Sequence, residues 1–186
     1  MLDTLEGEAL PPLRRHRPNF PWLTTGIRPK PNNQDEIMSE HSIRLEWKAA
    51  PHAQQPATYS RDHKATYSAQ VSVAVSAASA YLGNSDLADP EQLLVNALAS
   101  CHMLYFLAIC EGNGYVVSSY EDDAVGKVSK NPDGTFWVSD IVLHPKASFS
   151  SQKQPDRETL SRLHHRAHKG CFIANSIKTH VSIELG

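Results

Sequence analysis

Three cysteines are the side chains in this sequence best suited to nucleophilic chemistry: Cys101, Cys110 and Cys171. A cysteine attacks as its thiolate, and the oxidised sulfur that results can condense with a second thiol. Because the spacing contains no CxxC pair, it predicts neither a disulfide scaffold nor a zinc ribbon. Thiols that must stay reduced suit a cytoplasmic protein. Cys101 lies in the middle of a long apolar segment, and we look for chemistry there.

Histidines offer a second kind of chemistry, which is metal binding. His164 and His168 are four residues apart and could share a metal ion on one helix face. No third ligand stands at a matching spacing and the segment is polar, so we predict a solvated helix face without a metal. His102 follows Cys101, but adjacent helical residues do not face each other, which favours a role in the core or behind the thiol.

The segment from Asp89 to Glu111 predicts the helix that must position Cys101. Asp89 is a good N-cap, because its carboxylate can accept a backbone N–H of the first turn, and Pro90 suits the first helical position. The residues that follow are apolar on almost every side, which predicts a buried helix. On this evidence alone a buried thiol is more often inert packing than a nucleophile. Cys110 lies about 180° round the helix from Cys101 at ~100° per residue, so we predict that it is packing.

The other segments alternate between strand and helix patterns. Alternating apolar residues predict strands at 43–47, 67–75, 116–120, 124–130, 135–147 and 181–185. The turn sequence Asn-Pro-Asp-Gly at 131–134 predicts a hairpin. A second helix is expected from Asp156 to about Lys169, followed by a short helical segment after Gly170. This order of elements predicts an α+β fold.

Composition bounds the kind of protein. The 186 residues are 40% apolar with a net charge of −2, which suits a globular domain and implies no nucleic-acid partner. Residues 1–37 hold six of the twelve prolines and no periodic apolar pattern, so we predict a poorly ordered extension to a domain at 38–186. Translation could equally begin at Met38. The 89–111 segment approaches the length of a membrane span, but its polar residues argue against one.

Three motifs in this order resemble the OsmC/Ohr family, the osmotically inducible protein C and organic hydroperoxide resistance proteins. The run DPEQLLVNALASC places Glu91 ten residues before Cys101. The run AHKGC places Cys171 seventy residues after Cys101, and YSRDH, which contains Arg61, precedes both. The resemblance covers about residues 42–186.

The resemblance implies an intertwined homodimer, with antiparallel sheets wrapped around a long central helix in each subunit. It also implies a thiol peroxidase that needs no metal and no cofactor. Cys101 matches the peroxidatic cysteine and Cys171 matches the resolving cysteine. Glu91 matches a carboxylate that holds the active-site arginine, and Arg61 matches that arginine by its rough position. His102 and Phe172 depart from the organic hydroperoxide branch and place the chain nearer the OsmC-like branch.

The leading functional hypothesis is therefore reduction of organic hydroperoxides. Cys101 would become a sulfenic acid, Cys171 would close a disulfide, and an external dithiol, for which a lipoyl-type compound is one candidate, would reopen it. A first alternative is an OsmC-like binding protein that holds an apolar ligand at the dimer interface and has no peroxidase activity. A second is another thiol enzyme, such as an acyl or sulfur transferase, which would not need Cys171 within reach of Cys101.

Overall fold

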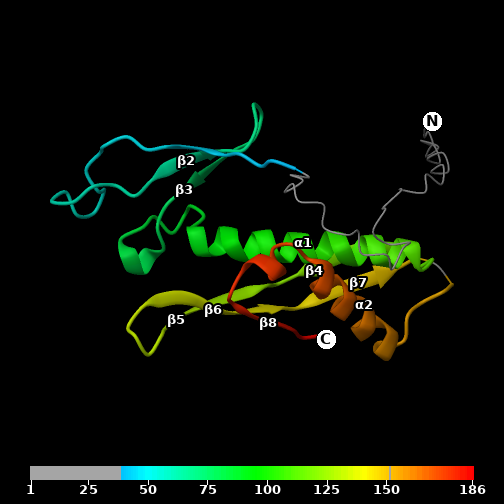
Figure 1. Cartoon of the computed structure of the whole chain (residues 1–186). Coiled ribbons are helices and arrows are strands. Elements are labelled where there is room, and N and C mark those ends of the chain that lie inside the picture. The colour runs from blue at the N-terminus through cyan, green and yellow to red at the C-terminus, as the bar shows by residue number, and fades with distance from the viewer. Residues whose placement is uncertain (1–38, 151) are drawn as a thin grey trace, which may run out of the picture. The chain divides into compact units, whose positions relative to one another are not determined.

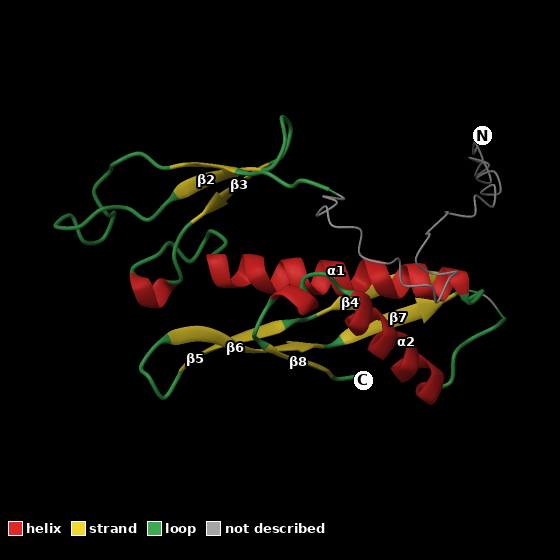
Figure 2. Ribbon diagram, in the orientation of Figure 1, coloured by secondary structure: helices red, strands yellow, loops and turns green. Residues whose placement is uncertain are grey.

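The computed structural model describes residues 39–150 and 152–186 (Figure 1). The predicted extension at 1–37 and the start at Met38 lie outside the described residues. The unit His41–Gly186 has the predicted mixture of helices and strands (Figure 2). In chain order its elements are β1 Arg44–Glu46, β2 His63–Thr66, β3 Ser72–Val75, the 3-10 turn η2 Ser79–Tyr81, α1 Pro90–Gly112, β4 Val117–Asp122, β5 Val125–Lys130, β6 Phe136–Leu143, β7 Pro145–Phe149, α2 Arg157–Gly170, the 3-10 turn η3 Ala174–Ser176 and β8 His180–Ile183.

Strands β4 to β8 form the surface on which α1 packs (Figure 1). The predicted hairpin is present: β5 and β6 pair antiparallel, and Gly134 takes the positive φ of 91° that the turn requires. The arm predicted at 135–147 is two strands, because pairing changes at His144 from β5 to β4. Strand β8 pairs with β6 in parallel, so this sheet is mixed, where only antiparallel pairing was expected.

Strands β1, β2 and β3 form a separate antiparallel sheet. The sequence pattern predicted no strand where β2 lies, since the only apolar side chain in β2 is the small Ala65, which gives little periodic signal. The strand expected to begin at Tyr67 starts at Ser72, after the turn between β2 and β3. Strand β1 was expected to be half-buried, but Leu45 is 60% exposed in the single chain.

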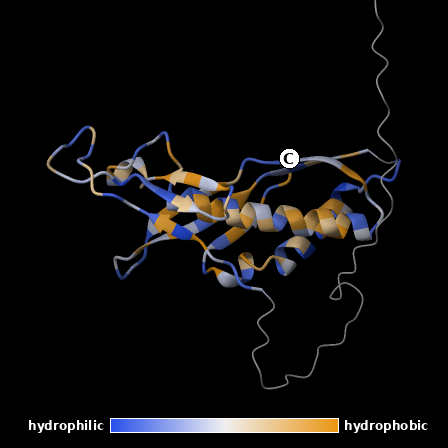
Figure 3. Ribbon diagram, turned by 90° about the horizontal axis from the view of Figure 1, so that it is seen from above, coloured by the Kyte–Doolittle hydropathy of each residue, from blue (hydrophilic) through white to orange (hydrophobic). Residues whose placement is uncertain are grey.

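Helix α1 begins as predicted. Asp89 accepts a hydrogen bond from the backbone N–H of Gln92 at 2.7 Å, and the Gln92 side chain accepts from the Asp89 N–H at 3.1 Å, which completes a capping box. Apolar residues run along the whole helix (Figure 3). By length and hydropathy α1 could span a membrane, a property that core helices share.

The prediction that α1 is buried on every side is wrong for a single chain. One face packs on the strands and α2 through Leu98, His102, Phe106, Ile109 and Cys110. The opposite side is open, and Leu104 there is 61% exposed. An apolar face of this kind on the longest helix calls for a covering partner.

Candidate functional site

The structure brings Cys101 and Cys171 together. Cys101 lies in the middle of α1, and Cys171 is the C-cap of α2, where its N–H donates to the carbonyl of Ala167 at 3.0 Å. Both thiols belong to one apolar cluster, built on Leu98 of α1 and on the buried strand residue Ile141. The two thiols lie close enough for Cys101 to influence the pKa of Cys171. Seventy residues apart in the sequence, the thiols are thus neighbours in space.

The two thiols have different surroundings. Cys171 is fully buried, and burial, aided by the nearby Cys101 thiol, raises the pKa of the Cys171 thiol to about 11. The backbone N–H of Ala174 points at the Cys171 sulfur at 3.4 Å and offsets part of this effect. Cys101 is only half-buried. At neutral pH Cys171 is therefore a protonated donor, and Cys101 is the thiol that a reagent can reach.

Tyr105 lies one helical turn after Cys101 and forms the wall next to both thiols. Burial raises the pKa of Tyr105, with smaller contributions from the nearby Cys101 and Cys171. Its ring stacks edge-on against Phe172 at 5.6 Å. A Cβ at Gly170 would lie 2.7 Å from two ring carbons of Tyr105, so only glycine lets α2 end this close to α1.

This contact leads to a testable prediction. Gly170→Ala should force the Tyr105 ring or the end of α2 to move, and should destabilise the protein by about 1–3 kcal/mol, as overpacking does. It should also slow formation of a Cys101–Cys171 disulfide, because Cys171 follows directly. Urea unfolding and disulfide formation with diamide measure the two effects. Gly112→Ala is the matched control, because a Cβ there meets no atom within 4 Å. Equal disulfide rates in both variants would contradict the prediction.

Cys110 behaves as a packing residue. It is fully buried in a different apolar cluster, with Phe106 and Leu163, and burial raises the pKa of its thiol to about 11. Cys101 lies in the other cluster, as the angular separation on α1 predicted.

Glu91 stands in the first turn of α1, and its Oε2 is buried without a hydrogen-bond partner among the described residues. Burying a carboxylate oxygen without a hydrogen bond costs folding free energy, so we expect a donor for this atom outside the single chain. Cys101 is ten residues further along the same helix, which is about 15 Å at 1.5 Å per residue. Glu91 therefore does not reach Cys101 of its own chain.

Arg61 contacts neither Glu91 nor Cys101 in the single chain. Its guanidinium lies over the ring of Tyr59, with Cζ 4.3 Å from the ring centroid, and donates to the Thr58 hydroxyl and the Tyr59 carbonyl. The His63 ring bonds to the Arg61 carbonyl at 2.9 Å. The structure thus brings together two of the four predicted site residues, Cys101 and Cys171.

A buried pair of histidines was missed. His102 is fully buried, as expected for a core role, and its Nε2 lies 3.0 Å from Nδ1 of His164. The prediction of a solvated face is wrong for His164, which is 2% exposed and stacks on Phe106 at 4.1 Å. Burial lowers the pKa of each ring to about 4. A helical wheel centred on Leu163 and Ala167 would have shown that His164 borders the apolar stripe.

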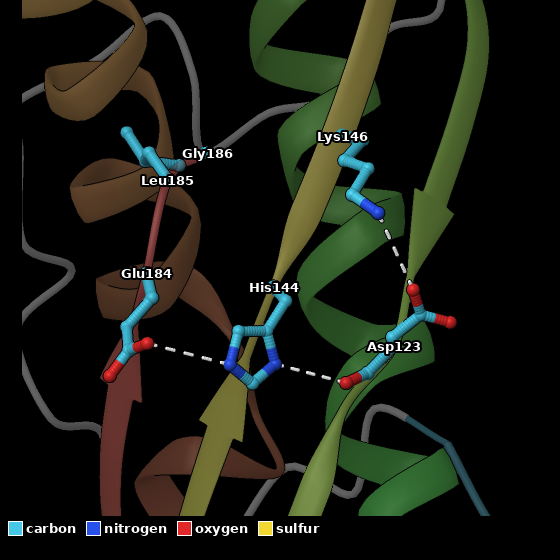
Figure 4. Close-up of a pocket in the computed structure, with 6 residues that line it drawn as sticks. All are labelled: Asp123, His144, Lys146, Glu184, Leu185 and Gly186. Carbon is cyan, nitrogen blue, oxygen red and sulfur yellow. Dashed lines mark hydrogen bonds and ion pairs between the residues drawn. The ribbon is translucent and has the colours of Figure 1, made fainter.

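One surface hollow among the described residues contains none of these side chains. It has a volume of about 470 Å³ and is lined by Asp123, His144, Lys146, Glu184 and the C-terminal residues (Figure 4). The His144 ring bonds to the Asp123 carbonyl at 2.9 Å and lies 3.5 Å from Glu184. These are exposed, solvent-screened contacts, and within the described residues no group of three side chains could hold a metal ion.

Comparison with known proteins places this chain in a family. The model of the OsmC-like protein family matches residues 83–186, which include Glu91, Cys101 and Cys171. An OsmC-like protein of unknown function from Vibrio cholerae is 40% identical, with 80% of this chain and 100% of that chain covered and a TM-score of 0.74. No curated protein matches the chain.

Two more distant structures share the fold. The organic hydroperoxide resistance protein of Bacillus subtilis is 19% identical, with 78% of this chain and 98% of that chain covered and a TM-score of 0.56. An organic hydroperoxide resistance protein from Legionella pneumophila is 16% identical, with 79% and 96% covered and a TM-score of 0.57. The motifs, the fold and the family model agree that this chain belongs to the OsmC-like protein family.

Proposed function

We propose that this protein is a cysteine-based peroxidase that reduces organic hydroperoxides. The observation that carries the proposal is the contact between a half-buried thiol, Cys101, and a buried, protonated one, Cys171. A two-cysteine peroxidase uses this asymmetry, because one sulfur must be accessible to the substrate while the other stays protonated until a sulfenic acid has formed. A binding protein or a transferase needs no second thiol within reach of the first.

The reaction balances with an external dithiol as reductant. The Cys101 thiolate attacks the hydroperoxide, a sulfenic acid forms as the O–O bond breaks, and the alkoxide takes a proton and leaves as an alcohol. Cys171 attacks the sulfenic sulfur, the disulfide forms, and water leaves. The dithiol then reduces the disulfide by exchange and is itself oxidised to a cyclic disulfide. A lipoyl-type compound suits this last step, and a reducing cytoplasm suits the whole cycle.

The proposal includes a homodimer whose copies complete each other's sites. The exposed apolar side of α1, with Leu104 at 61% exposure, needs a cover, and a second α1 supplies one. Glu91 has an unpaired buried oxygen but lies about 15 Å along the helix from its own Cys101. Across an isologous interface Glu91 would instead lie near Cys101 of the other copy. The Arg61 guanidinium would then move away from the Tyr59 ring and form an ion pair with Glu91.

The dimer leads to a prediction. The protein should sediment as a dimer at micromolar concentration, and Leu104→Glu should shift it toward monomer, because a charge cannot be buried unpaired at such an interface. Arg166→Glu, a charge change at an exposed position of α2, is the matched control and should leave the dimer intact. Sedimentation of the native protein as a monomer would contradict the dimer and the shared sites.

The arginine has its own test. Arg61→Ala should slow Cys101 oxidation at neutral pH by about 10-fold or more, with partial recovery at higher pH, where more thiol ionises unaided. Glu91→Ala should show a weaker form of the same defect. Arg44→Ala is the control, since Arg44 forms an exposed ion pair with Glu46 at 3.2 Å. If Arg44→Ala alone is slow, the arginine is misassigned and the mechanism stands.

The function is tested by stopped-flow oxidation of the reduced protein with cumene hydroperoxide and with hydrogen peroxide. We expect the organic peroxide to react faster, because apolar residues surround Cys101. Absence of reaction with either peroxide would contradict the proposal and favour the ligand-binding alternative.

A further inference from the structure

Two buried histidines tie together the helices that carry the two thiols. His102 follows Cys101 on α1, and His164 lies on α2, seven residues before Cys171. Their rings are nearly coplanar, with an angle of 3° between planes, and they share a hydrogen bond of 3.0 Å. We infer that this bond is a positioning device that sets α2 on α1 so that Cys171 stays within reach of Cys101.

Rigid geometry connects the bond to the thiols. Phe106 stacks on the His164 ring, with 4.1 Å between the ring centroids. Leu163 and Ala167, which flank His164 in the sequence of α2, pack into the same cluster as Phe106. From His164 the helix continues unbroken to Gly170, and the Cys171 N–H is anchored to its last turn through the carbonyls of Ala167 and His168. A shift of α2 at His164 therefore moves Cys171 with it.

The chemistry of the second step makes this position matter. A disulfide requires the two sulfurs about 2.05 Å apart and a narrow range of Cα separations. A misplacement of about 1 Å can cost about 100-fold in the rate of a reaction between held groups. The resolving step is thus sensitive to the α1–α2 packing, whereas attack on a free hydroperoxide by Cys101 is not.

The polar pair is a costly way to fill a core. His102 Nδ1 and His164 Nε2 are both buried without a hydrogen-bond partner among the described residues, so one bond is all that the two rings gain from each other. Two apolar residues of similar volume would fill the space without that cost. A directional bond, unlike an apolar contact, permits one register of the two helices and disfavours the rest. Positional precision is what the pair provides.

This inference rests on the proposed function for its role in the catalytic cycle, but its geometric content is testable without any peroxide. The main variant is the double replacement His102→Leu with His164→Leu, which removes both hydrogen-bonded nitrogens together and so leaves no new unpaired group. His102→Gln and His164→Asn are the conservative variants, because their amides place a polar atom near the bonded Nε2 and Nδ1. His165→Leu is the control, since His165 is the exposed neighbour on α2.

The first measurement is a redox titration of full-length protein in glutathione buffers, with the Cys101–Cys171 disulfide counted by peptide mass spectrometry. We expect the double leucine variant to lower the effective concentration of the two thiols by about 10- to 100-fold. His102→Gln and His164→Asn should each keep most of the native effective concentration, and His165→Leu should match the native protein. Thermal unfolding checks that each variant is folded.

The second measurement separates the two peroxidase steps. In a Cys171→Ser background, dimedone trapping reports the first oxidation of Cys101, and the histidine variants should leave its rate unchanged. With both cysteines present, the double leucine variant should close the disulfide about 10-fold more slowly. If the double variant does not fold, His102→Met against His102→Gln gives the same comparison at similar volume.

The outcomes are distinct. A double leucine variant that is folded and has the native effective concentration overturns the inference, whatever the peroxidase assay gives. A lowered effective concentration in a protein that no hydroperoxide oxidises upholds the positioning role and overturns the proposed function. The glutamine and asparagine variants could lower the effective concentration as much as the double leucine variant does. That result would mean that packing volume, and not the hydrogen bond, sets the helix position, and it would also overturn the inference.

Discussion

Cys101→Ser is expected to reduce the rate of hydroperoxide consumption by at least about 1,000-fold. The attack requires a thiolate, and a serine hydroxyl is neither ionised nor a soft nucleophile at neutral pH. The fold should be little changed, because Cys101 is only half-buried and serine differs by one atom. The measurement is stopped-flow loss of cumene hydroperoxide in the presence of an excess of dithiol.

Two other cysteine variants are the controls. Cys110→Ser should keep the native rate at equal folded concentration, because Cys110 lies in a separate cluster. Cys171→Ser should complete the first oxidation and then accumulate sulfenic and sulfinic acid at Cys101, since no resolving thiol remains. Native consumption by Cys101→Ser would show that the assigned sulfur is wrong.

The second large effect is a loss of stability in mild acid. Burial lowers the pKa of His102 and of His164 to about 4, from 6.5. Because the unfolded chain takes up protons between these values and the folded chain does not, stability is complete above pH 6.5 and falls as the pH drops toward 4. A lowering of this size corresponds to about 3 kcal/mol for one group. The two rings interact, so their combined effect is less than twice that.

Urea unfolding at intervals between pH 7 and pH 4 measures this loss. The double variant His102→Leu with His164→Leu should lose much less stability over the same range. Carboxylates such as Asp156, whose pKa is lowered by the N–H of Thr159, add their loss only below about pH 4 and are common to both proteins. An identical pH dependence in the two proteins would show that the histidines are not buried as neutral rings.

The parts of the fold that were predictable carry their signals locally. The cap at Asp89, the turn at Gly134 and the start of α2 at Asp156 each depend on a few adjacent residues, and each lies where the pattern placed it. The parallel pairing of β8 with β6 depends on chain segments about forty residues apart, which no local pattern encodes. The small Ala65 left β2 without a periodic signal.

In the candidate site, too, residues marked by local motifs were predictable and contacts between distant segments were not. The motifs around Cys101 and Cys171 singled out both thiols, and the structure places them in contact. The i, i+4 spacing of His164 and His168 pointed to a solvated face, because nothing local shows that His102, 62 residues earlier, comes to meet His164. Arg61 was matched by position alone, and in one chain it lies on Tyr59, away from Glu91. In the proposed dimer the pairing of Arg61 with Glu91 would depend on a second copy, which periodicity in one chain does not encode.

A single-turnover reaction tests the proposed two-cysteine mechanism most directly. Reduced full-length protein is mixed with one equivalent of cumene hydroperoxide, quenched with acid, alkylated and mapped by peptide mass spectrometry. We expect one Cys101–Cys171 disulfide for each peroxide consumed, with Cys110 recovered as the free thiol. Consumption of the peroxide with Cys101 and Cys171 both recovered as free thiols would contradict this mechanism.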